Sequence, residues 1–168
     1  MLFSMYPNIA MQIEGQYITY PDIFRRVAKN KYFQNSVYLD TYTVKDGQTP
    51  EHIAYKLYGD AQYHWIVLLA NDILDVYHEW PMSTDSLIKM CKDKYGETSI
   101  YATHHYALES NKDIRIDYDP DKFASGEIVA IDNFTYELLE NEKKAEIILL
   151  KPEYLNQFVG QFKDLIQK

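Results

Sequence analysis

Residues 42–73 read YTVKDGQTPEHIAYKLYGDAQYHWIVLLANDI, and this stretch carries the clearest structural signals in the chain. Tyr42-Thr43-Val44 consists of residues that favour strands, and Asp46-Gly47 is a turn dipeptide. Thr49 follows as a good N-cap, with Pro50 at the first helical position, where its missing N–H has no partner to lose. The order of these signals predicts a strand, a turn and then a helix.

Two helices are expected in the rest of this stretch. The apolar stripe of the first recurs at helical spacing and consists of Ile53, Ala54 and Leu57. Gly59 supplies the left-handed residue that ends a helix, and Asp60 can cap the next one at once. The second helix ends near Asn71, and its apolar residues are Trp65, Ile66, Leu68 and Leu69. Because a Gly-Asp corner cannot continue one helix axis, the two helices must fold back and pack on each other and on the preceding strand.

The segment before residue 41 reads as an extended arm followed by a helix. Residues 13–20 have a strand-like composition that Gly15 interrupts. Pro21 and Asp22 then open a helical pattern that runs to about Asn35, with one apolar face made of Ile23, Phe24, Val27 and Ala28. The first residues, 1–13, are rich in large apolar side chains. They suit either a core strand or a docking arm, and we favour the arm.

The segment after residue 80 begins with a helix and then changes to alternation. Ser83 or Thr84 caps a helix that Gly96 ends and that carries the apolar residues Leu87, Ile88 and Cys91. Ile114, Ile116 and Tyr118 then alternate with charged residues, and residues 127–131 form another short β run. Residues 134–150 allow a helix or a hairpin. The alternation on either side of residues 141–144 favours the hairpin.

The last segment predicts an amphipathic helix that starts at Pro152. Its apolar stripe has an unbroken i, i+3, i+4, i+7 spacing and consists of Leu155, Phe158, Val159, Phe162, Leu165 and Ile166. The chain stops within this helix, so the stripe either continues in a longer product or docks on a partner. Together with the apolar start of the chain, it gives a set of candidate partner-docking residues: Leu2, Phe3, Met5, Tyr6, Phe158, Phe162 and Leu165.

Composition limits the classes of function. The chain has 168 residues, 46% of them hydrophobic and 25% charged, which is typical of a globular protein. Its formal charge of -8 argues against nucleic acid or an anionic membrane as a partner. Cys91 is the only cysteine, which fits folding in a reducing cytoplasm, and residues 1–11 suggest neither a signal peptide nor a membrane span. The 16 tyrosines suit either interfaces or strands.

No pattern of residues predicts catalysis, a cofactor or a metal. The five histidines are His52, His64, His78, His104 and His105, and no cysteine or acidic ligand stands at a matching offset. His104 and His105 are adjacent and would point to opposite faces of a strand. Cys91 lies on an apolar helix stripe and reads as a buried structural thiol. The acidic string that starts at Asp117 lacks the glycine and the glutamate of a calcium loop, so a polar loop is expected there.

The stretch Tyr42–Ile73 resembles a LysM module, which opens with a Tyr-Thr-Val strand and continues into a helix containing Ile-Ala. The aromatic second helix and Glu79-Trp80-Pro81-Met82 are similar to the version of LysM found in phage tail proteins. The LysM-like motif residues are Tyr42, Val44, Gly47, Thr49, Ile53, Ala54, Gly59, Trp65, Asn71, Trp80 and Pro81. Glycan-binding modules end with a Pro-Gly-containing strand. Here we expect that strand to survive only as a short piece around residues 76–80, which argues against sugar binding.

Further stretches, residues 100–106 and 136–155, resemble the family of the baseplate wedge protein numbered fifty-three in contractile-tailed phages of the T-even type. The resemblance covers most of the chain. It implies a non-catalytic structural subunit of the virion, assembled in the host cytoplasm in six-fold copies, that joins other wedge proteins and helps wedges close around the hub. Hub proteins are further candidate partners.

We therefore predict an α+β fold with three segments. Residues 1–40 form an N-terminal arm and helix, and residues 41–96 form a LysM-like β-α-α(-β) unit with an extra helix. Residues 97–168 form a C-terminal β-hairpin region ending in a helix. The alternative function is a peptidoglycan- or N-acetylglucosamine-binding module that stacks sugars on Tyr42, Tyr58 or Trp80. A cell-wall hydrolase is disfavoured, since no acid pair or Cys-His pair is suitably placed.

Overall fold

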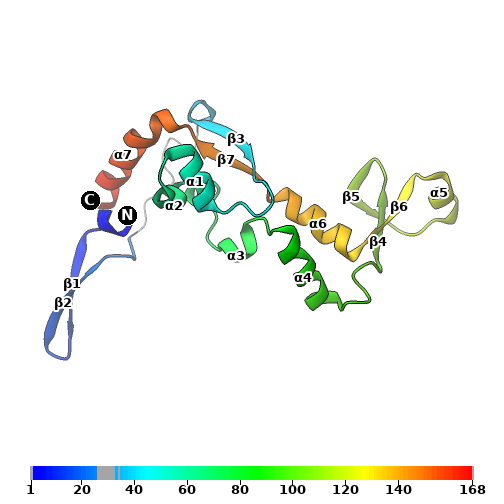
Figure 1. Ribbon diagram of the computed structural model, residues 1–168, viewed down its shortest axis with the longest axis horizontal. Coiled ribbons are helices and arrows are strands. Elements are labelled where there is room, and N and C mark those ends of the chain that lie inside the picture. Colours follow the sequence, from blue (N-terminus) through cyan, green and yellow to red (C-terminus); the bar gives the residue numbers. More distant parts are fainter. Residues whose placement is uncertain (1, 26–32, 34, 168) are drawn as a thin grey trace. The chain divides into compact units, whose positions relative to one another are not determined.

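The computed structural model describes residues 2–25, 33 and 35–167 (Figure 1). It mixes helices with antiparallel strands, which confirms the predicted α+β class. The chain divides into two compact units. Unit 1 consists of Met1–Val44, Gln48–Glu79 and Glu146–Lys168, and unit 2 of Lys45–Gly47 and Trp80–Ala145. Most of unit 2 is therefore a single insertion into the sequence of unit 1.

Unit 1 contains a hairpin, a two-stranded sheet and most of the helices. Its strands are β1 (Asn8–Ile13), β2 (Gln16–Pro21), β3 (Leu39–Thr43) and β7 (Glu146–Leu150). Its α-helices are α1 (Pro50–Tyr58), α2 (His64–Ala70), α3 (Val76–Glu79) and α7 (Leu155–Gln167). Short 3-10 turns are η1 (Leu2–Met5), η3 (Ser36–Tyr38), η4 (Ala61–Tyr63) and η5 (Pro152–Tyr154).

The predicted cap of α1 is confirmed, whereas Asp60 caps the 3-10 turn η4 that precedes α2 and not α2 itself. The Thr49 hydroxyl accepts the N–H of His52, and His52 Nδ1 accepts the N–H of Thr49, each at 3.4 Å, which closes a capping box. Gly59 ends α1 in the left-handed region, with φ 79°. The Asp60 carboxylate then accepts the N–H of Gln62 at 2.9 Å and starts the next turn. These local bonds satisfy backbone groups at both ends of α1 and at the start of η4, where the chain reverses toward α2.

The core of unit 1 lies between α2, β7 and α7. Trp65 on α2 is 7% exposed, and its ring centroid lies 5.9 Å from that of Phe158 and 4.7 Å from that of Phe162, both on α7. Further buried members of this cluster are Phe33, Ile66, Ala70, Leu150, Leu155 and Ile166. The last helix, which the sequence predicts as amphipathic, thus buries its stripe largely within its own unit.

Strand β3 pairs antiparallel with β7, from Leu39 opposite Leu150 to Thr43 opposite Glu146. The expected strand around residues 76–80 is therefore wrong, because α3 occupies that stretch and β7 is the partner of β3. Two acidic side chains favour the helical conformation of α3 over a strand by accepting backbone N–H groups. The Glu79 carboxylate accepts the N–H groups of Leu74 and Asp75, and Asp75 accepts the N–H of Tyr77.

The N-terminal strands form a hairpin, with Asn8 opposite Pro21 and Ile13 opposite Gln16. Its two loop residues, Glu14 and Gly15, both have positive φ, as a type I′ turn requires. The helix expected from residue 21 does not begin there: Pro21 ends β2, and the N–H of Arg25 bonds to the Asp22 carbonyl in a turn. The rest of that expected helix, residues 26–32 and 34, lies outside the described residues.

Unit 2 is a three-stranded antiparallel sheet with helices. Its elements are α4 (Thr84–Tyr95), β4 (Thr103–Leu108), β5 (Asn111–Ile116), α5 (Pro120–Ser125), β6 (Ile128–Asp132) and α6 (Asn133–Lys143). The strand order is β5-β4-β6. The core contains Leu87 and Cys91 of α4 with Ile100, against which Phe134 and Leu138 of α6 pack. The predicted helix that Ser83 caps and Gly96 ends is confirmed.

The hairpin favoured for residues 134–150 is wrong, since most of this stretch is α6. The Asp132 carboxylate caps the helix by accepting the N–H of Thr135 at 2.7 Å. Near its other end, the Asn141 amide accepts the N–H of Met82 at 2.7 Å and donates to its carbonyl at 3.0 Å. The apolar residues that alternate from Ile147 onward belong to β7, and the partner of this strand is β3.

Replacing Trp65 with alanine tests the core of unit 1. We expect Trp65→Ala to lower the free energy of unfolding by about 3–5 kcal/mol, because the indole fills the space beside two phenylalanine rings. Urea unfolding followed by circular dichroism measures the change. Tyr55→Ala on the exposed side of α1 is the control and should change stability by less than about 0.5 kcal/mol. Equal effects of the two variants would contradict this description of the core.

Replacing Asn71 tests the anchor of β7. Its amide donates to the Val67 and Ile148 carbonyls and accepts the Ile148 N–H, all at 2.8 Å. Asn71→Ala leaves these backbone groups unsatisfied, so we expect it to destabilise the chain by about 1–3 kcal/mol. Urea unfolding again gives the value. Asn156→Ala, at an exposed position of α7, should have little effect, and a similar loss there would count against the anchor.

Candidate interaction surfaces

Most of the LysM-like motif residues shape unit 1 from within. Val44, Ile53, Ala54 and Trp65 are buried, and Gly47 and Gly59 take positive φ at the turns. Thr49 caps α1 and Asn71 holds β7, as described above. Gly47, Trp80 and Pro81 belong to unit 2, where Trp80 is buried. These residues therefore contribute to the fold through burial, turn conformation, helix capping and the bond to β7.

The aromatic residues considered for sugar stacking do not form one exposed platform. Tyr42 is half-buried, and its hydroxyl donates to Gln48 at 2.9 Å. Tyr58 donates its hydroxyl to the Leu150 carbonyl at 2.9 Å, and burial raises the pKa of that hydroxyl well above its usual range. Trp80 is buried in the other unit. The side chain of Tyr58 thus makes a hydrogen bond within unit 1, and that of Trp80 is buried in unit 2.

The candidate docking residues fall into two groups. Phe158 and Phe162 are buried in the core of unit 1, and Leu2, Met5 and Tyr6 are half-buried against the same core. Phe3 and Leu165 are exposed. The sequence does not separate the two groups, because one amphipathic stripe suits a core and an interface equally well.

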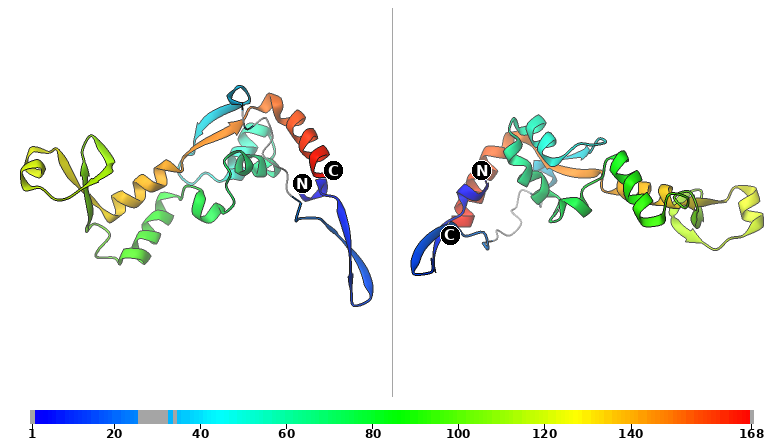
Figure 2. Two further views of the ribbon diagram at one scale, coloured as in Figure 1. Left: turned by 180° about the vertical axis from the view of Figure 1, so that it is seen from behind. Right: turned by 60° about the horizontal axis from the view of Figure 1, so that its bottom comes forward.

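The hairpin of β1 and β2 is an exposed apolar surface of unit 1, and Figure 2 shows it as a long two-stranded ribbon. All its strand residues are exposed except Ile9, which is half-buried. Its exposed large apolar side chains are Met11, Ile13, Tyr17, Ile18 and Tyr20. The Glu14-Gly15 turn between two β-prone runs is the signal that could have predicted this hairpin.

In unit 2, His104 and His105 gather around Tyr136. The ring of His104 stacks on that of Tyr136 at 4.1 Å, and the Nδ1 atoms of the two histidines are 2.8 Å apart. The expectation that the two histidines point apart is wrong, because the pairing of β4 with β6 shifts register between Thr103 and His105. Burial, with the charges of Arg115 and His104, lowers the pKa of His105.

Glu137 links α6 to α4 through two short hydrogen bonds. Lys94 Nζ and the Tyr95 hydroxyl each donate to its carboxylate at 2.6 Å. Burial acts to raise the pKa of Glu137, but the hydrogen bonds from Lys94 and Tyr95 outweigh it and the pKa is lowered. The charged form of Glu137 therefore stabilises the packing of the two helices.

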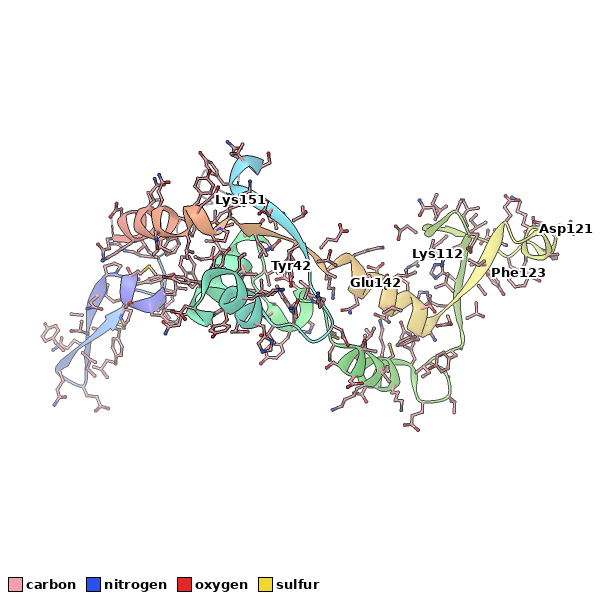
Figure 3. The ribbon with its side chains drawn as sticks, turned by 45° about the horizontal axis from the view of Figure 1, so that its top comes forward. Tyr42, Lys112, Asp121, Phe123, Glu142 and Lys151 are labelled. Atoms are coloured by element: carbon pink, nitrogen blue, oxygen red, sulfur yellow. The ribbon has the colours of Figure 1, made fainter. Side chains whose placement is uncertain are left out.

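An aromatic cluster lies where β4 meets α5, which carries the Asp121 and Phe123 labelled in Figure 3. The ring of Tyr106 lies 4.9 Å from that of Tyr118 and 6.0 Å from that of Phe123. Tyr118 and Phe123 are exposed. Elsewhere in unit 2, a depression of about 190 Å³ is lined in part by His105, Lys112 and Arg115. Arg115 lies over the Tyr136 ring at 5.3 Å.

Within the ranges that the structure describes, no group of three or more His, Cys, Asp or Glu side chains could hold a metal ion. The same residues include no helix that is long and apolar enough to span a membrane.

Exposed apolar strand residues and exposed aromatic side chains are features of a protein that assembles with other proteins. The chain belongs to the base plate wedge protein 53 family, whose model matches residues 1–122. It is similar to the baseplate wedge protein gp53 of Enterobacteria phage T4, with 27% identity over an aligned length of 192 residues. The match covers 100% of this chain and 97% of that protein. This membership gives the chain a structural role in a phage baseplate.

The Glu137 contact predicts a pH-dependent contribution to the stability of unit 2. Because its folded pKa is lowered, the contribution is complete above about pH 4.3, the ordinary glutamate pKa, and is lost as the pH falls through the lowered value. The stability difference between the unmodified chain and Glu137→Gln should therefore shrink in acid. Urea unfolding at a series of pH values measures it. Glu142→Gln on the exposed side of α6 is the control (Figure 3), and the same trend there would contradict the assignment.

Proposed function

We propose that this chain joins neighbouring wedge proteins in a phage tail baseplate and helps six wedges close around the hub. The main support is the family membership, together with a similarity to the T4 wedge protein that extends over nearly the whole of both chains. In this proposal the chain is a non-catalytic component of the virion, is assembled in the host cytoplasm, and has other wedge proteins and hub proteins as partners.

The exposed hairpin is the observation that carries the joining role. A two-stranded hairpin alone is at best marginally stable in water, and this one exposes apolar side chains on Met11, Tyr17 and Ile18. Glu14 is its only charged residue. Covering such a surface with another protein removes apolar area from water at roughly 25 cal/mol per Å². Aromatic side chains such as Tyr17 are common anchors in interfaces.

The hairpin is the target of the test. The tagged chain is co-expressed with the other baseplate wedge proteins of its phage, and the captured partners are quantified. We expect the unmodified chain to retain at least one of them, and Tyr17→Ser with Ile18→Ser to reduce the recovered partner by about ten-fold, since buried interface anchors commonly contribute 2 kcal/mol or more (about 1.4 kcal/mol per factor of ten).

Tyr77→Ser is the matched control, because Tyr77 is 86% exposed and lies on α3 instead of the hairpin. Its recovery should equal that of the unmodified chain. A chain that captures no wedge protein would contradict the proposed function. Equal losses in Tyr77→Ser and the hairpin variant would contradict the role of the hairpin.

A further inference from the structure

The hydrogen bonds around β3 and β7 define which backbone groups point outward. In an antiparallel pair, directly opposed residues alternate between bonded and non-bonded pairs. The N–H of Lys151 donates to the Tyr38 carbonyl at 2.9 Å, which makes residues 38 and 151 a bonded pair. By alternation, Asp40 and Tyr42 are bonded to β7, whereas the backbone groups of Leu39, Thr41 and Thr43 point away from it.

Side chains of unit 1 occupy the outer edge of β7. Ile148, which lies opposite Thr41, points its N–H and carbonyl at the Asn71 amide, with both bonds at 2.8 Å. The carbonyl of Leu150 accepts the Tyr58 hydroxyl at 2.9 Å. The amide of Asn71 thus acts as one residue of a neighbouring strand would, and a further strand cannot add at this position.

The outer edge of β3 has no comparable cover. The N–H of Leu39 bonds to the Ser36 carbonyl, but among the residues that the structure describes, no hydrogen bond is made by the outward groups of Thr41 and Thr43. Both threonines are exposed. The strand also lacks the proline or lysine that commonly protects an edge, since it reads LDTYT, and its one charge, on Asp40, lies 3.9 Å from Lys151.

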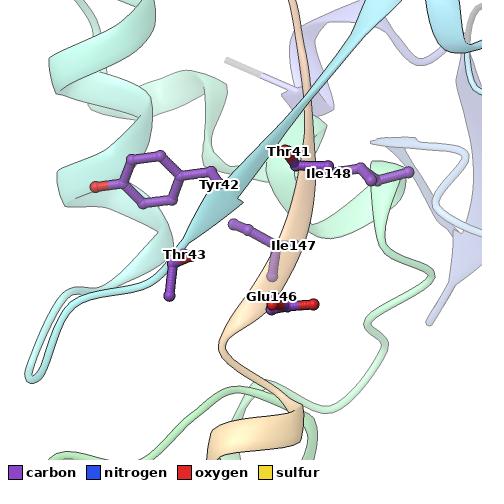
Figure 4. A pocket seen from close by; sticks show the side chains of 6 residues that line it. All are labelled: Thr41, Tyr42, Thr43, Glu146, Ile147 and Ile148. Atoms are coloured by element: carbon purple, nitrogen blue, oxygen red, sulfur yellow. The ribbon is translucent and has the colours of Figure 1, made fainter.

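Two depressions lie along the same ribbon. One, of about 330 Å³, is lined by residues 41–43 of β3 and 146–148 of β7, and Figure 4 shows their side chains around it. The other, of about 300 Å³, is lined by residues 40–42 together with Leu57, Leu149, Leu150 and Pro152. An open row of backbone donors and acceptors beside pockets for side chains is the arrangement that binds an extended peptide.

We propose that β3 accepts an extended segment of a different baseplate protein, which adds to the ribbon as a third strand. This inference rests on the proposed function, since it supplies one contact of the assembly. The backbone of the added segment would bond to the outward N–H and carbonyl groups of Thr41 and Thr43. Its side chains would reach the depressions beside Tyr42.

A second copy of this chain fits the same edge less well. An edge of five residues buries far less than the roughly 1,200–2,000 Å² of a stable interface between two proteins. Each copy also carries a formal charge of -8, which opposes association with itself. A segment of a different protein that is already held in the assembly needs no large interface of its own, because tethering raises its effective concentration.

Amide hydrogen exchange with residue resolution tests the proposal, comparing the free chain with the chain in a purified wedge complex. In the free chain, the amides of Thr41 and Thr43 should exchange fast, whereas those of Asp40 and Tyr42 should be protected by β7. In the complex, the first two should slow by roughly five- to ten-fold, the effect of a net hydrogen bond. Unchanged exchange at both threonines in a complex that forms normally would overturn the proposal and leave the proposed function standing.

Substitution of Thr41 provides a second readout. Thr41→Pro removes only an outward N–H, so the bonds to β7 remain and proline is tolerated at such an edge. We expect it to reduce the partner recovered with the chain by about five-fold or more, whereas Thr41→Val, which keeps the N–H, should retain normal recovery. Full recovery with a folded Thr41→Pro chain would overturn the proposal. Protection of the Thr41 amide in the chain alone that increases with protein concentration would also overturn it, since that result identifies a second copy as the occupant.

Discussion

The packing of unit 1 depends on the hydrogen bonds between the side-chain amide of Asn71 and the backbone of β7. The β3–β7 ribbon has only two strands, and such ribbons are marginal unless a further element covers them. Asn71 joins the end of α2 to the middle of β7 through both backbone groups of Ile148. The residues between them include Trp80–Ala145, so the bond fixes where the chain re-enters unit 1 after the insertion. Once β7 is fixed, α7 follows directly and buries Phe158 and Phe162 against Trp65.

Local signals made part of this fold predictable from the sequence. Thr49 and Ser83 begin helices as expected, and Gly59 and Gly96 end them. Each of these residues acts on backbone groups within a few positions of itself, so its effect does not depend on tertiary contacts. The stripe on α7 was predictable for the same reason, since the i, i+3, i+4 spacing depends only on helix geometry.

Pairings between distant segments were not predictable in this way. Residues 76–80 looked suitable for the strand opposite β3, but Glu79 and Asp75 satisfy that backbone as a helix, and β7 supplies the strand. Residues 134–143 carry aromatic and apolar side chains that suit a strand. The cap at Asp132 and the packing of Phe134 and Leu138 on α4 decide for a helix. At His104, a register shift in β4 brings two rings together that strict alternation would separate. Of the candidate interaction surfaces, the edge of β3 depends on such a distant pairing, with β7, whereas the β1–β2 hairpin is local and its Glu14-Gly15 turn is a signal in the sequence.

The two edges of the ribbon show how unit 1 distinguishes its own contacts from those left for other proteins. If β7 were open like β3, a foreign strand could add on either side, and the ribbon could also continue from copy to copy. Asn71 and Tyr58 close the β7 side with side chains that α1 and α2 hold in place, so addition is limited to one edge. The open edge needs no ordering of its own, because β7 already holds β3 in an extended conformation. A segment that adds there loses its own conformational freedom, whereas the strand that receives it does not, and a preformed edge therefore binds more tightly than a flexible one of the same sequence.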